Sequence, residues 1–485
     1  MCGIVGLRLK NKLASKINVL SLVNYALYQL THRGQEGAGY AWSVGKSLES
    51  YKDFGYADAV YGEMLRTYQS KNLITHQAIG HVRYPTQGPP IYKNLQPIMV
   101  SSHFGRLFSL VSNGNLTDYP AERQIMEGGK DRFDFESSSE AELILRKIID
   151  HHVKERQKNN GGEADFIKSI MFAIEYFKGA FSSILMTRNN MFAFMDRFGF
   201  RPLWFGETDD FCVFASELCA LDILGIRVDK RQELRPGQIY HLSDNGLNIY
   251  QYAIEQINTK YCIFEMIYFA RPDSVQWGMS VYKYRQELGR LLAQKDPDLD
   301  FDLIVPVPDS ANFIAMGYAQ QKGTLEKFMQ NALIRNHYIG RTFIKPDQTV
   351  RNESVRRKFN PLPEIFLGKK IVLVDDSIVR GTTIRKIVSM IFKAGAREIH
   401  LRIGSPPKRY PCFYGIATPT HEEHAWRKFH GLEGLIRYIL EPVQQYIRAG
   451  GRFTLKYLDY NDLLRSVDRP ENFCMACFDG DYPIE

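Results

Sequence analysis

Two apolar runs joined by a helix constrain the fold of this chain more than any other feature. The runs KIVLVD at 370–375 and EIHLRIG at 398–404 predict buried β-strands. Between them, apolar side chains recur every three or four residues, which predicts an amphipathic helix from about Thr382 to Ala394. Because parallel neighbouring strands need a crossover connection, this strand–helix–strand unit predicts a parallel sheet.

The two halves of the chain differ in pattern. The first half contains many short β-type runs separated by turn signals, with helices predicted only at 15–30 and 139–156. Such a pattern favours stacked sheets covered by helices. In the second half, strands and helices alternate, beginning with a strand at 302–306 and a helix at 310–322. We place the boundary near 246–260, a segment with a turn and little periodicity.

Length, charge and cysteine usage narrow the class of protein. A chain of 485 residues is too long for one core, so two or three domains are expected. The net charge of +8 is a mild excess that argues against a nucleic-acid partner and favours local anion sites. The chain shows no secretory signal and no apolar stretch long enough for a membrane span, so we expect a cytoplasmic protein. Seven cysteines, an odd number, argue against a disulfide framework.

Cys2 is the first candidate catalytic residue. Methionine aminopeptidase removes Met1 before a small residue, so the mature chain is expected to begin with Cys2. A free α-amino group has a pKa of about 7.7–8.0 and can act as the base for the thiol of its own residue. The pair is then a self-contained nucleophile and base, as in N-terminal-nucleophile enzymes. A cysteine at this position can also be incidental, and Cys2 alone does not decide between these interpretations.

Four motifs follow one another in the first half of the chain: MCGIVGL at 1–7, HRGQEGAG at 32–39, GHVRYPTQG at 80–88 and SNGNLTD at 112–118. Together they resemble the class II glutamine amidotransferase domain, which implies an α+β N-terminal-nucleophile fold with αββα layers. The resemblance assigns the oxyanion donors to the Asn113 side chain and the Gly114 N–H. It also assigns Arg83 to the glutamine α-carboxylate and Glu140 to the glutamine ammonium group.

Two residues depart from the pattern of that family. Ser112 stands where relatives usually have His before NGN, and Glu140 stands where they usually have Asp. Glu140 preserves the charge on a side chain that is longer by one methylene. Both departures bear on glutamine affinity, but they leave the nucleophile and an oxyanion donor in place.

A second set of candidate residues directly follows the strand at 370–375. They open a helix, in the context where backbone N–H groups and the helix dipole hold a phosphate. A capped acidic helix start explains the two carboxylates, but not the strand, the glycine and the paired threonines together. The segment resembles the phosphoribosyl pyrophosphate (PRPP) loop of type I phosphoribosyltransferases, which have an α/β fold with a parallel sheet. The residues assigned to PRPP by this resemblance are Asp375, Asp376, Ser377, Ile378, Val379, Arg380, Gly381, Thr382 and Thr383.

Two further segments support a PRPP site. The run VPVPDSANFIAMGYA at 305–319 resembles the element that places Ser310 near the metal, so we expect Mg²⁺ at Ser310 and the two carboxylates of the PRPP loop. Residues 335–360 resemble the flexible loop that closes over PRPP. Its basic run at 356–358 is either a solvated surface or a pyrophosphate contact, and we favour the contact, with Lys358 the best single candidate. Such a lid protects PRPP from water.

Four cysteines far apart in the sequence form the last candidate site. Cys474 and Cys477 form a C-x-x-C, and Cys262 and Cys412 complete a set of four thiolates. By number alone, such a set fits a [4Fe–4S] cluster or a Cys₄ zinc site. The surrounding segments resemble cluster-bearing glutamine PRPP amidotransferases, which implies a structural [4Fe–4S] cluster that holds the C-terminal tail to the transferase domain. Such relatives commonly carry a propeptide before the catalytic cysteine, where this chain has only Met1.

The resemblance to glutamine PRPP amidotransferases covers the chain from Cys2 to Tyr482. It implies a glutaminase domain at 2–250, a phosphoribosyltransferase domain at 256–450 and a tail at 451–485 with the C-x-x-C. The implied reaction converts PRPP, glutamine and water to 5-phosphoribosylamine, pyrophosphate and glutamate, the committing step of purine synthesis. Ammonia is expected to pass internally between two sites. The family further implies inhibition by purine nucleotides and a homotetramer or homodimer.

Three alternatives remain open from the sequence. A sugar-phosphate aminating enzyme shares the first half but lacks the PRPP loop. A non-catalytic PRPP-sensing regulator has no need of a terminal cysteine or of NGN. A diverged paralogue that uses mainly ammonia is consistent with Ser112, Glu140 and Ala417, the last in GIATPT where relatives often show GIDMP. Comparing glutamine-dependent with ammonia-dependent pyrophosphate release distinguishes these cases.

Overall fold

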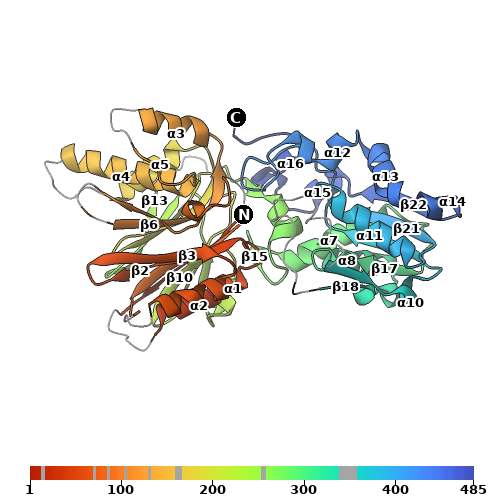
Figure 1. Ribbon diagram of the computed structural model, residues 1–485, viewed down its shortest axis with the longest axis horizontal. Coiled ribbons are helices and arrows are strands. Elements are labelled where there is room, and N and C mark those ends of the chain that lie inside the picture. The colour runs from red at the N-terminus through yellow and green to blue at the C-terminus, as the bar shows by residue number, and fades with distance from the viewer. Residues whose placement is uncertain are drawn as a thin grey trace.

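The computed structural model describes residues 1–11, 17–68, 73–84, 88–102, 105, 107–128, 133–158, 166–252, 258–336, 338 and 358–484. These residues form two lobes that lie side by side, with the start of the chain at their junction (Figure 1). The first lobe contains two antiparallel sheets and the second contains a parallel sheet. Within the described part of the chain, no helix is both long and apolar enough to cross a membrane.

The first sheet of the N-terminal lobe carries the start of the chain. In spatial order its strands are β11 (Arg231–Glu233), β9 (Trp204–Glu207), β10 (Phe211–Ala215), β1 (Gly3–Leu9), β4 (Gln77–Arg83), β2 (Gly37–Val44) and β3 (Ser47–Phe54). One face of this sheet packs against helices α1 (Val19–Gln29) and α2 (Ala57–Thr67). The cysteines at 212 and 219, which lie in an apolar segment of the sequence, are both buried core thiols.

The second sheet lies against the other face of the first. Its strands, in spatial order, are β13 (Gly246–Gln251), β12 (Gln238–Ser243), β8 (Met191–Met195), β7 (Gly179–Met186), β6 (Leu107–Leu116) and β5 (Ile98–Ser101). Ile4 and Ile79 of the first sheet meet Val111 and Ile184 of the second in one buried cluster. Helices α4 (Glu140–Lys158) and α5 (Phe166–Tyr176) cover its outer face. The predicted αββα layering is therefore confirmed.

The prediction of only two helices in this lobe is wrong. The structure adds α2, α5 and α3 (Tyr119–Gly128). Helix α2 buries only Ala57, Val60 and Met64, and α3 buries only Tyr119 and Met126, so neither has an apolar stripe wide enough to stand out in the sequence. Helix α5 does carry apolar residues at helical spacing, a pattern that predicts a helix. The predicted boundary segment also begins with a strand, the exposed edge strand β13.

The second lobe has the predicted parallel sheet, in the order β17 (Leu303–Pro306), β20 (Lys370–Asp375), β21 (Glu398–Ile403) and β22 (Arg452–Tyr457). Helices α7 (Val281–Gln294) and α8 (Asn312–Lys322) cover one face, and α11 (Thr382–Lys393) and α13 (Leu432–Leu440) cover the other. Successive residues of β20 alternate between these two cores, which is why the strand is apolar throughout. The predicted division at residue 450 falls just before β22, which pairs with β21.

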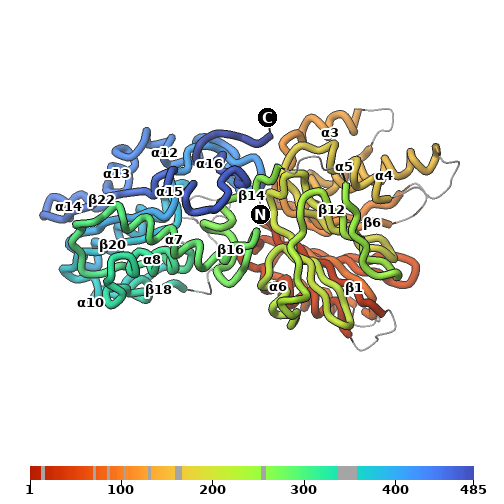
Figure 2. The backbone as a smooth tube through the Cα atoms, turned by 180° about the vertical axis from the view of Figure 1, so that it is seen from behind, coloured from red at the N-terminus to blue at the C-terminus, as the bar shows by residue number. Residues whose placement is uncertain are grey.

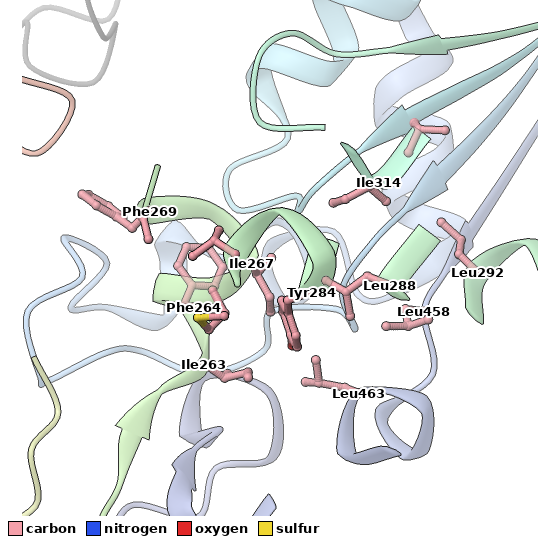
Figure 3. Packing of buried hydrophobic residues seen from close by; sticks show 14 of the residues in the cluster. Ile263, Phe264, Ile267, Phe269, Tyr284, Leu288, Leu292, Ile314, Leu458 and Leu463 are labelled. Atoms are coloured by element: carbon pink, nitrogen blue, oxygen red, sulfur yellow. The ribbon is translucent and has the colours of Figure 1, made fainter. Parts of the chain in front are cut away.

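A continuous apolar cluster joins the two lobes. It runs from Phe269 and Ile263 near the junction to Leu292 and Ile314 in the second lobe (Figure 3), and it also includes Cys2. The short π-helix η3 (Glu265–Phe269) lies in this region.

Buried charges cross the same junction. Arg33 of the HRGQ motif is fully buried and pairs with Glu217 and, at 2.8 Å, with Glu265 of η3. Breaking a buried pair of this kind typically costs about 3–5 kcal/mol, because an uncompensated charge is left behind. Arg33 of the HRGQ motif therefore connects the first lobe to η3.

The C-terminal tail returns to the junction. Its strand β23 (Phe473–Cys474) pairs in parallel with β14 (Tyr261–Cys262), and α16 (Ala476–Asp479) follows beside them (Figure 2). The remaining short elements include α6 (Cys219–Asp222), β15 (Val275–Gln276), β16 (Met279–Ser280), β18 (Leu333–Arg335), β19 (Phe359–Pro361), α10 (Pro363–Phe366), α12 (Ala425–Lys428), α14 (Gln444–Arg448) and α15 (Tyr460–Arg465). The tail thus connects the end of the chain to the segment that links the two lobes.

Candidate active sites and cysteine site

Packing of the two antiparallel sheets brings Cys2 to Asn113. Cys2 directly precedes β1, whereas Asn113 lies in β6 of the facing sheet. The backbone N–H of Cys2 donates a hydrogen bond to Asn113 Oδ1 at 2.8 Å. The Cys2 side chain is buried, and the backbone N–H of Tyr84 donates to its Sγ at 3.4 Å. The predicted nucleophile and the predicted oxyanion donor therefore share one site.

Asn113 and Gly114, the predicted oxyanion donors, lie next to each other in β6. The Nδ2 group of Asn113 is buried and has no hydrogen-bond partner among the described residues. A buried donor without a partner is costly, and a substrate oxyanion satisfies it. At Gly114, an added Cβ lies 1.8 Å from the carbonyl oxygen of Ala180, so the backbone packs too closely for any side chain. Asn113 thus offers a donor at the site, whereas close packing against β7 requires glycine at position 114.

Met1, which precedes Cys2 in the chain, is buried. Burial lowers the pKa of its terminal amine to about 4, so that this amine is neutral near pH 7. It is the nitrogen of Cys2, and not that of Met1, that lies against Asn113. Removal of Met1 turns the Cys2 nitrogen into the terminal amine at the position it already occupies.

Arg83 is paired with a carboxylate that the sequence did not point to. Its Nη1 contacts Glu36 of the HRGQEGAG motif, and both side chains are almost completely buried. Arg83, Cys2 and Glu140 line one small cavity, together with Ser112, Gly114 and neighbouring residues. The pairing with Glu36 fixes the guanidinium at the cavity and compensates its charge.

Glu140 is the first residue of α4 and also lines the cavity. One of its carboxylate oxygens, Oε1, accepts a hydrogen bond from the backbone N–H of Leu116 at 2.9 Å. Burial raises the pKa of Glu140 to about 8, with a further contribution from the nearby Asp118 carboxylate. Without a bound cation, this carboxyl is therefore mostly protonated near pH 7.

A second cavity, of about 220 Å³, lies at the carboxyl ends of β17 and β20. Ligands of open parallel sheets bind at this edge. The cavity is lined by Ser310, by Lys358 and by every residue from Asp375 to Thr383, so it brings together all the side chains assigned to PRPP and its metal. Residues 339–357 of the loop predicted to close over PRPP, with Arg356 and Arg357, lie outside the described residues.

The two carboxylates of this cavity are buried side by side. Burial raises the pKa of Asp375 and Asp376, and in Asp375 the neighbouring carboxylate raises it further. Lys358 opposes this shift at Asp375, and the fully buried Arg285 opposes it at Asp376. Two adjacent buried carboxylates ionise together only when cations compensate them. The pair is thus suited to a ligand that brings a divalent cation.

The loop itself ends at Gly381, which caps α11 with φ +76°, in the left-handed region that favours glycine. The backbone N–H of Ala425 in α12 donates to Val379 O at 2.7 Å and supports the loop from outside. Arg380 lines the cavity, but its guanidinium pairs with Glu423 and contacts Ala417 O at 3.4 Å. Arg380 is therefore held toward the wall that contains Ala417.

Tyr84 connects the two cavities and was missed from the sequence. Its backbone holds the Cys2 thiol, and the residue lines both the cavity of Cys2 and the cavity of the PRPP loop. Its ring packs edge-on against Phe269 of η3, with the ring centroids 5.5 Å apart. The only signal in the sequence was its position in GHVRYPTQG, directly after Arg83. The two sites are thus separated by one aromatic residue and its neighbours.

The four cysteines of the predicted cluster converge at the junction of the lobes. Cys262 in β14 and Cys474 in β23 are directly paired across the two strands. Cys474 interacts electrostatically with Cys262, Cys412 and Cys477. Burial raises the pKa of the Cys262, Cys474 and Cys477 thiols. In the part of the chain that the structure describes, no three His, Cys, Asp or Glu side chains are arranged to hold a single metal ion.

Comparison with known proteins agrees with both lobes. Residues 91–222 match the family described as a glutamine amidotransferase domain. The amidophosphoribosyltransferase of Methanocaldococcus jannaschii is 35% identical and matches all of this chain and 98% of its own length. That of Bacillus subtilis is 37% identical over 95% of this chain and 90% of the relative. The structure of the B. subtilis glutamine PRPP amidotransferase complexed with ADP and GMP superimposes with a TM-score of 0.79 at 35% identity, covering 100% of this chain and 98% of that one.

A glutamine amidotransferase lobe with an N-terminal-nucleophile fold, followed by a phosphoribosyltransferase lobe with a parallel sheet, defines an enzyme that moves the amide nitrogen of glutamine to a phosphoribosyl group. Within that class, the relatives that match over most of their own length are amidophosphoribosyltransferases. The chain belongs to the amidophosphoribosyltransferase family. It is a glutamine PRPP amidotransferase and performs the first step of purine biosynthesis.

Proposed function

We propose that Cys2, freed by removal of Met1, attacks the glutamine carboxamide and that the released ammonia passes directly to PRPP. The single observation that carries this proposal is that Tyr84 holds the Cys2 thiol and also lines the PRPP cavity. The thiolate forms a bond to the amide carbon, the C–N bond breaks and ammonia leaves. Water then hydrolyses the thioester to glutamate. Ammonia attacks C1 of PRPP, and pyrophosphate leaves with the electrons of the broken C–O bond.

The glutaminase roles follow from the cavity around Cys2. Asn113 Nδ2 and the Gly114 N–H stabilise the oxyanion, and the unpartnered Nδ2 supports this role for Asn113. The planar fork of Arg83, oriented by Glu36, binds the substrate α-carboxylate. Glu140 in its ionised form binds the substrate ammonium group. The terminal amine of Cys2 is the base that takes the thiol proton.

The PRPP roles follow from the second cavity. The backbone of the loop from Ser377 to Thr383 holds the 5′-phosphate at the start of α11, and Asp375 and Asp376 bind the ribose hydroxyls. Lys358 contacts pyrophosphate. The oxygen ligands of Ser310, Asp375 and Asp376 suit Mg²⁺, which is commonly bound by one or two carboxylates together with substrate phosphates. When bound, the ion supplies charge compensation for the departing pyrophosphate.

The cysteine site fits a [4Fe–4S] cluster. Cys474 interacts with the other three thiols of this set, of which Cys262 and Cys477 are buried and Cys412 is partly buried, and four cysteine ligands are the usual complement of such a cluster. When bound, the cluster ties the tail to β14 and has a structural role. A zinc ion is the competing occupant.

Iron and acid-labile sulfide analysis tests the cysteine site. Protein purified without oxygen is expected to contain about four iron and four sulfide per chain, because a [4Fe–4S] cluster has that composition. The variant Cys474→Ser is expected to lose most of the iron, whereas Cys212→Ser, which changes a buried thiol in β10, keeps it. Zinc in place of iron contradicts the cluster.

The family relationship supports two further proposals. The B. subtilis relative was solved with ADP and GMP, and we propose that purine nucleotides bind and inhibit this enzyme as well. A homotetramer or homodimer is the proposed assembly.

For the domain division we propose a glutaminase domain at 2–250, a transferase domain from 256 and a tail with the C-x-x-C. We assign β22 to the transferase domain because it extends that sheet.

Glu140 is expected to make glutamine binding depend on pH. Because burial raises its pKa to about 8, the carboxylate that binds the substrate ammonium forms only as the pH approaches that value. The KM for glutamine is therefore expected to fall about 25-fold between pH 6.5 and pH 8.5. The folded chain holds this proton where the unfolded chain releases it, so Glu140 lowers the free energy of unfolding as pH rises from 4.5 to about 8.

Steady-state glutaminase kinetics and urea unfolding at several pH values check this prediction. Glu140→Gln is expected to raise the KM and to remove the Glu140 contribution to both pH dependences. Glu136→Gln, at an exposed glutamate just before α4, serves as the control and keeps them. A wild-type KM that is flat from pH 6.5 to pH 8.5 is the contradicting result.

A further inference from the structure

Lys408 is a buried ammonium group in an unusual environment. The residue is 1% exposed, and its Nζ donates a hydrogen bond to the hydroxyl of Thr418 and lies 5.4 Å from the centre of the Phe264 ring. It forms no ion pair with a carboxylate of the described residues. Burial lowers the pKa of Lys408, and the side chains of Cys477, Cys412 and Cys262 oppose this shift more strongly than Glu423 does. The Glu423 carboxylate already pairs with Arg380.

Burying a charge without a counter-charge destabilises the folded state, so the buried position of Lys408 requires an explanation. Arg201 provides the comparison, because it is equally buried and also faces Cys262 and Cys412. Its charge is compensated by Glu265 at 3.3 Å. Lys408 has no such carboxylate, and the cysteines beside it become negatively charged only as metal-bound thiolates.

We propose that Lys408 is a positioning residue of the cysteine site, whose ammonium compensates the negative charge of the metal-bound thiolates and ties them to the wall of the PRPP cavity. The proposal rests on the cluster assigned under the proposed function. The tie consists of two contacts. Lys408 donates to the Thr418 hydroxyl, and the Cys412 backbone N–H donates to Thr418 O at 3.0 Å. Thr418 itself lines the PRPP cavity. Phe264, under the ammonium, belongs to the cluster that joins the lobes (Figure 3).

The charge predicts two properties of the loaded site. A neighbouring cation stabilises the more negative, reduced state of a cluster and so raises its midpoint potential. It also stabilises bound thiolates against loss of metal, and partners outside the ligand set typically change metal retention 10–100-fold. Lys408→Met keeps the length of the side chain and removes the charge. It is therefore expected to shift the midpoint potential to a more negative value and to release iron to a chelator about 10-fold faster.

Three further variants isolate the charge. Lys408→Arg keeps it, and Thr418→Val keeps it while removing the hydrogen bond, so both are expected to retain a midpoint potential near that of the wild type. Lys52→Met is the matched control, because Lys52 also contacts the neutral oxygens of Leu95 and Pro97 and the Tyr92 ring. It lies in β3 of the first lobe, outside the cysteine site. The variant is expected to leave both the potential and iron retention unchanged.

The measurements are iron and sulfide per chain, redox titration of the cluster and the rate of iron release, all on full-length protein purified without oxygen. If Lys408→Met keeps the midpoint potential and the iron-release rate of the wild type, the proposed role of Lys408 is wrong, although the cluster assignment is unaffected. An equal shift in Thr418→Val overturns it as well, because the effect then comes from packing and not from charge. If the wild-type protein contains no iron, the cluster assignment is wrong and this proposal fails with it. The metal analysis alone distinguishes this outcome from a failure of the role of Lys408.

Discussion

Replacement of Cys2 by alanine is expected to abolish glutamine-dependent formation of phosphoribosylamine and to leave the ammonia-dependent reaction in place. The thiol of Cys2 is the proposed nucleophile, and loss of a covalent nucleophile lowers turnover by at least about 10³-fold. Alanine also permits removal of Met1, so the chain terminus is unchanged. The PRPP cavity lies in the other lobe, and its lining does not include Cys2. Ammonia supplied from solution therefore still reacts there.

Pyrophosphate release measured with glutamine and with ammonium chloride checks this expectation. Cys212→Ala is the control, because Cys212 is a buried thiol of β10 that lines neither cavity, and both activities are expected to persist. Retention of glutamine-dependent activity in Cys2→Ala refutes the nucleophile. Mass analysis of the mature wild-type chain gives a second test, because a retained Met1 leaves no free amine at Cys2.

Asp376→Asn is expected to reduce both activities, about 10²–10³-fold, while glutamine hydrolysis by Cys2 continues. Asp376 is buried beside Asp375 in the PRPP cavity, with the Ser377 hydroxyl donating to it at 2.6 Å. An amide at this position is neutral and offers a single acceptor oxygen, so it binds ribose hydroxyls and Mg²⁺ less well. The loss is in the transferase step and therefore does not depend on the nitrogen source.

The two variants together separate the sites. Cys2→Ala loses one route and Asp376→Asn loses both, and this difference is read from the same two assays. Asp298→Asn, at an exposed position before β17, is the control for removing a carboxylate from the second lobe, and both activities are expected to remain. Full ammonia-dependent activity in Asp376→Asn contradicts the assignment of Asp376 to PRPP.

The sequence predicted the parts of this protein whose structure is determined by neighbouring residues. The strand β20 was predicted with its observed bounds, and α11 with an end that differs by one residue, because apolar alternation and helical periodicity are local properties. Gly381 and Gly114 were singled out for the same reason, since each lies in a short motif with a backbone requirement of its own. Helices α2 and α3 were missed because few of their side chains are buried, so their apolar stripes are narrow.

The arrangement of the site depended on contacts between residues far apart in the chain. Cys2 meets Asn113 only because two sheets pack face to face, and Tyr84 reaches the PRPP cavity only because the lobes meet at η3. The pairing of Arg83 with Glu36 and the position of Lys408 among the cysteines are likewise invisible in the sequence pattern. Local patterns determine which residues can do chemistry. The packing of sheets and lobes decides which of these residues meet. Residues far apart in the chain come together when they are buried in the same region, and that burial also determines their charge states.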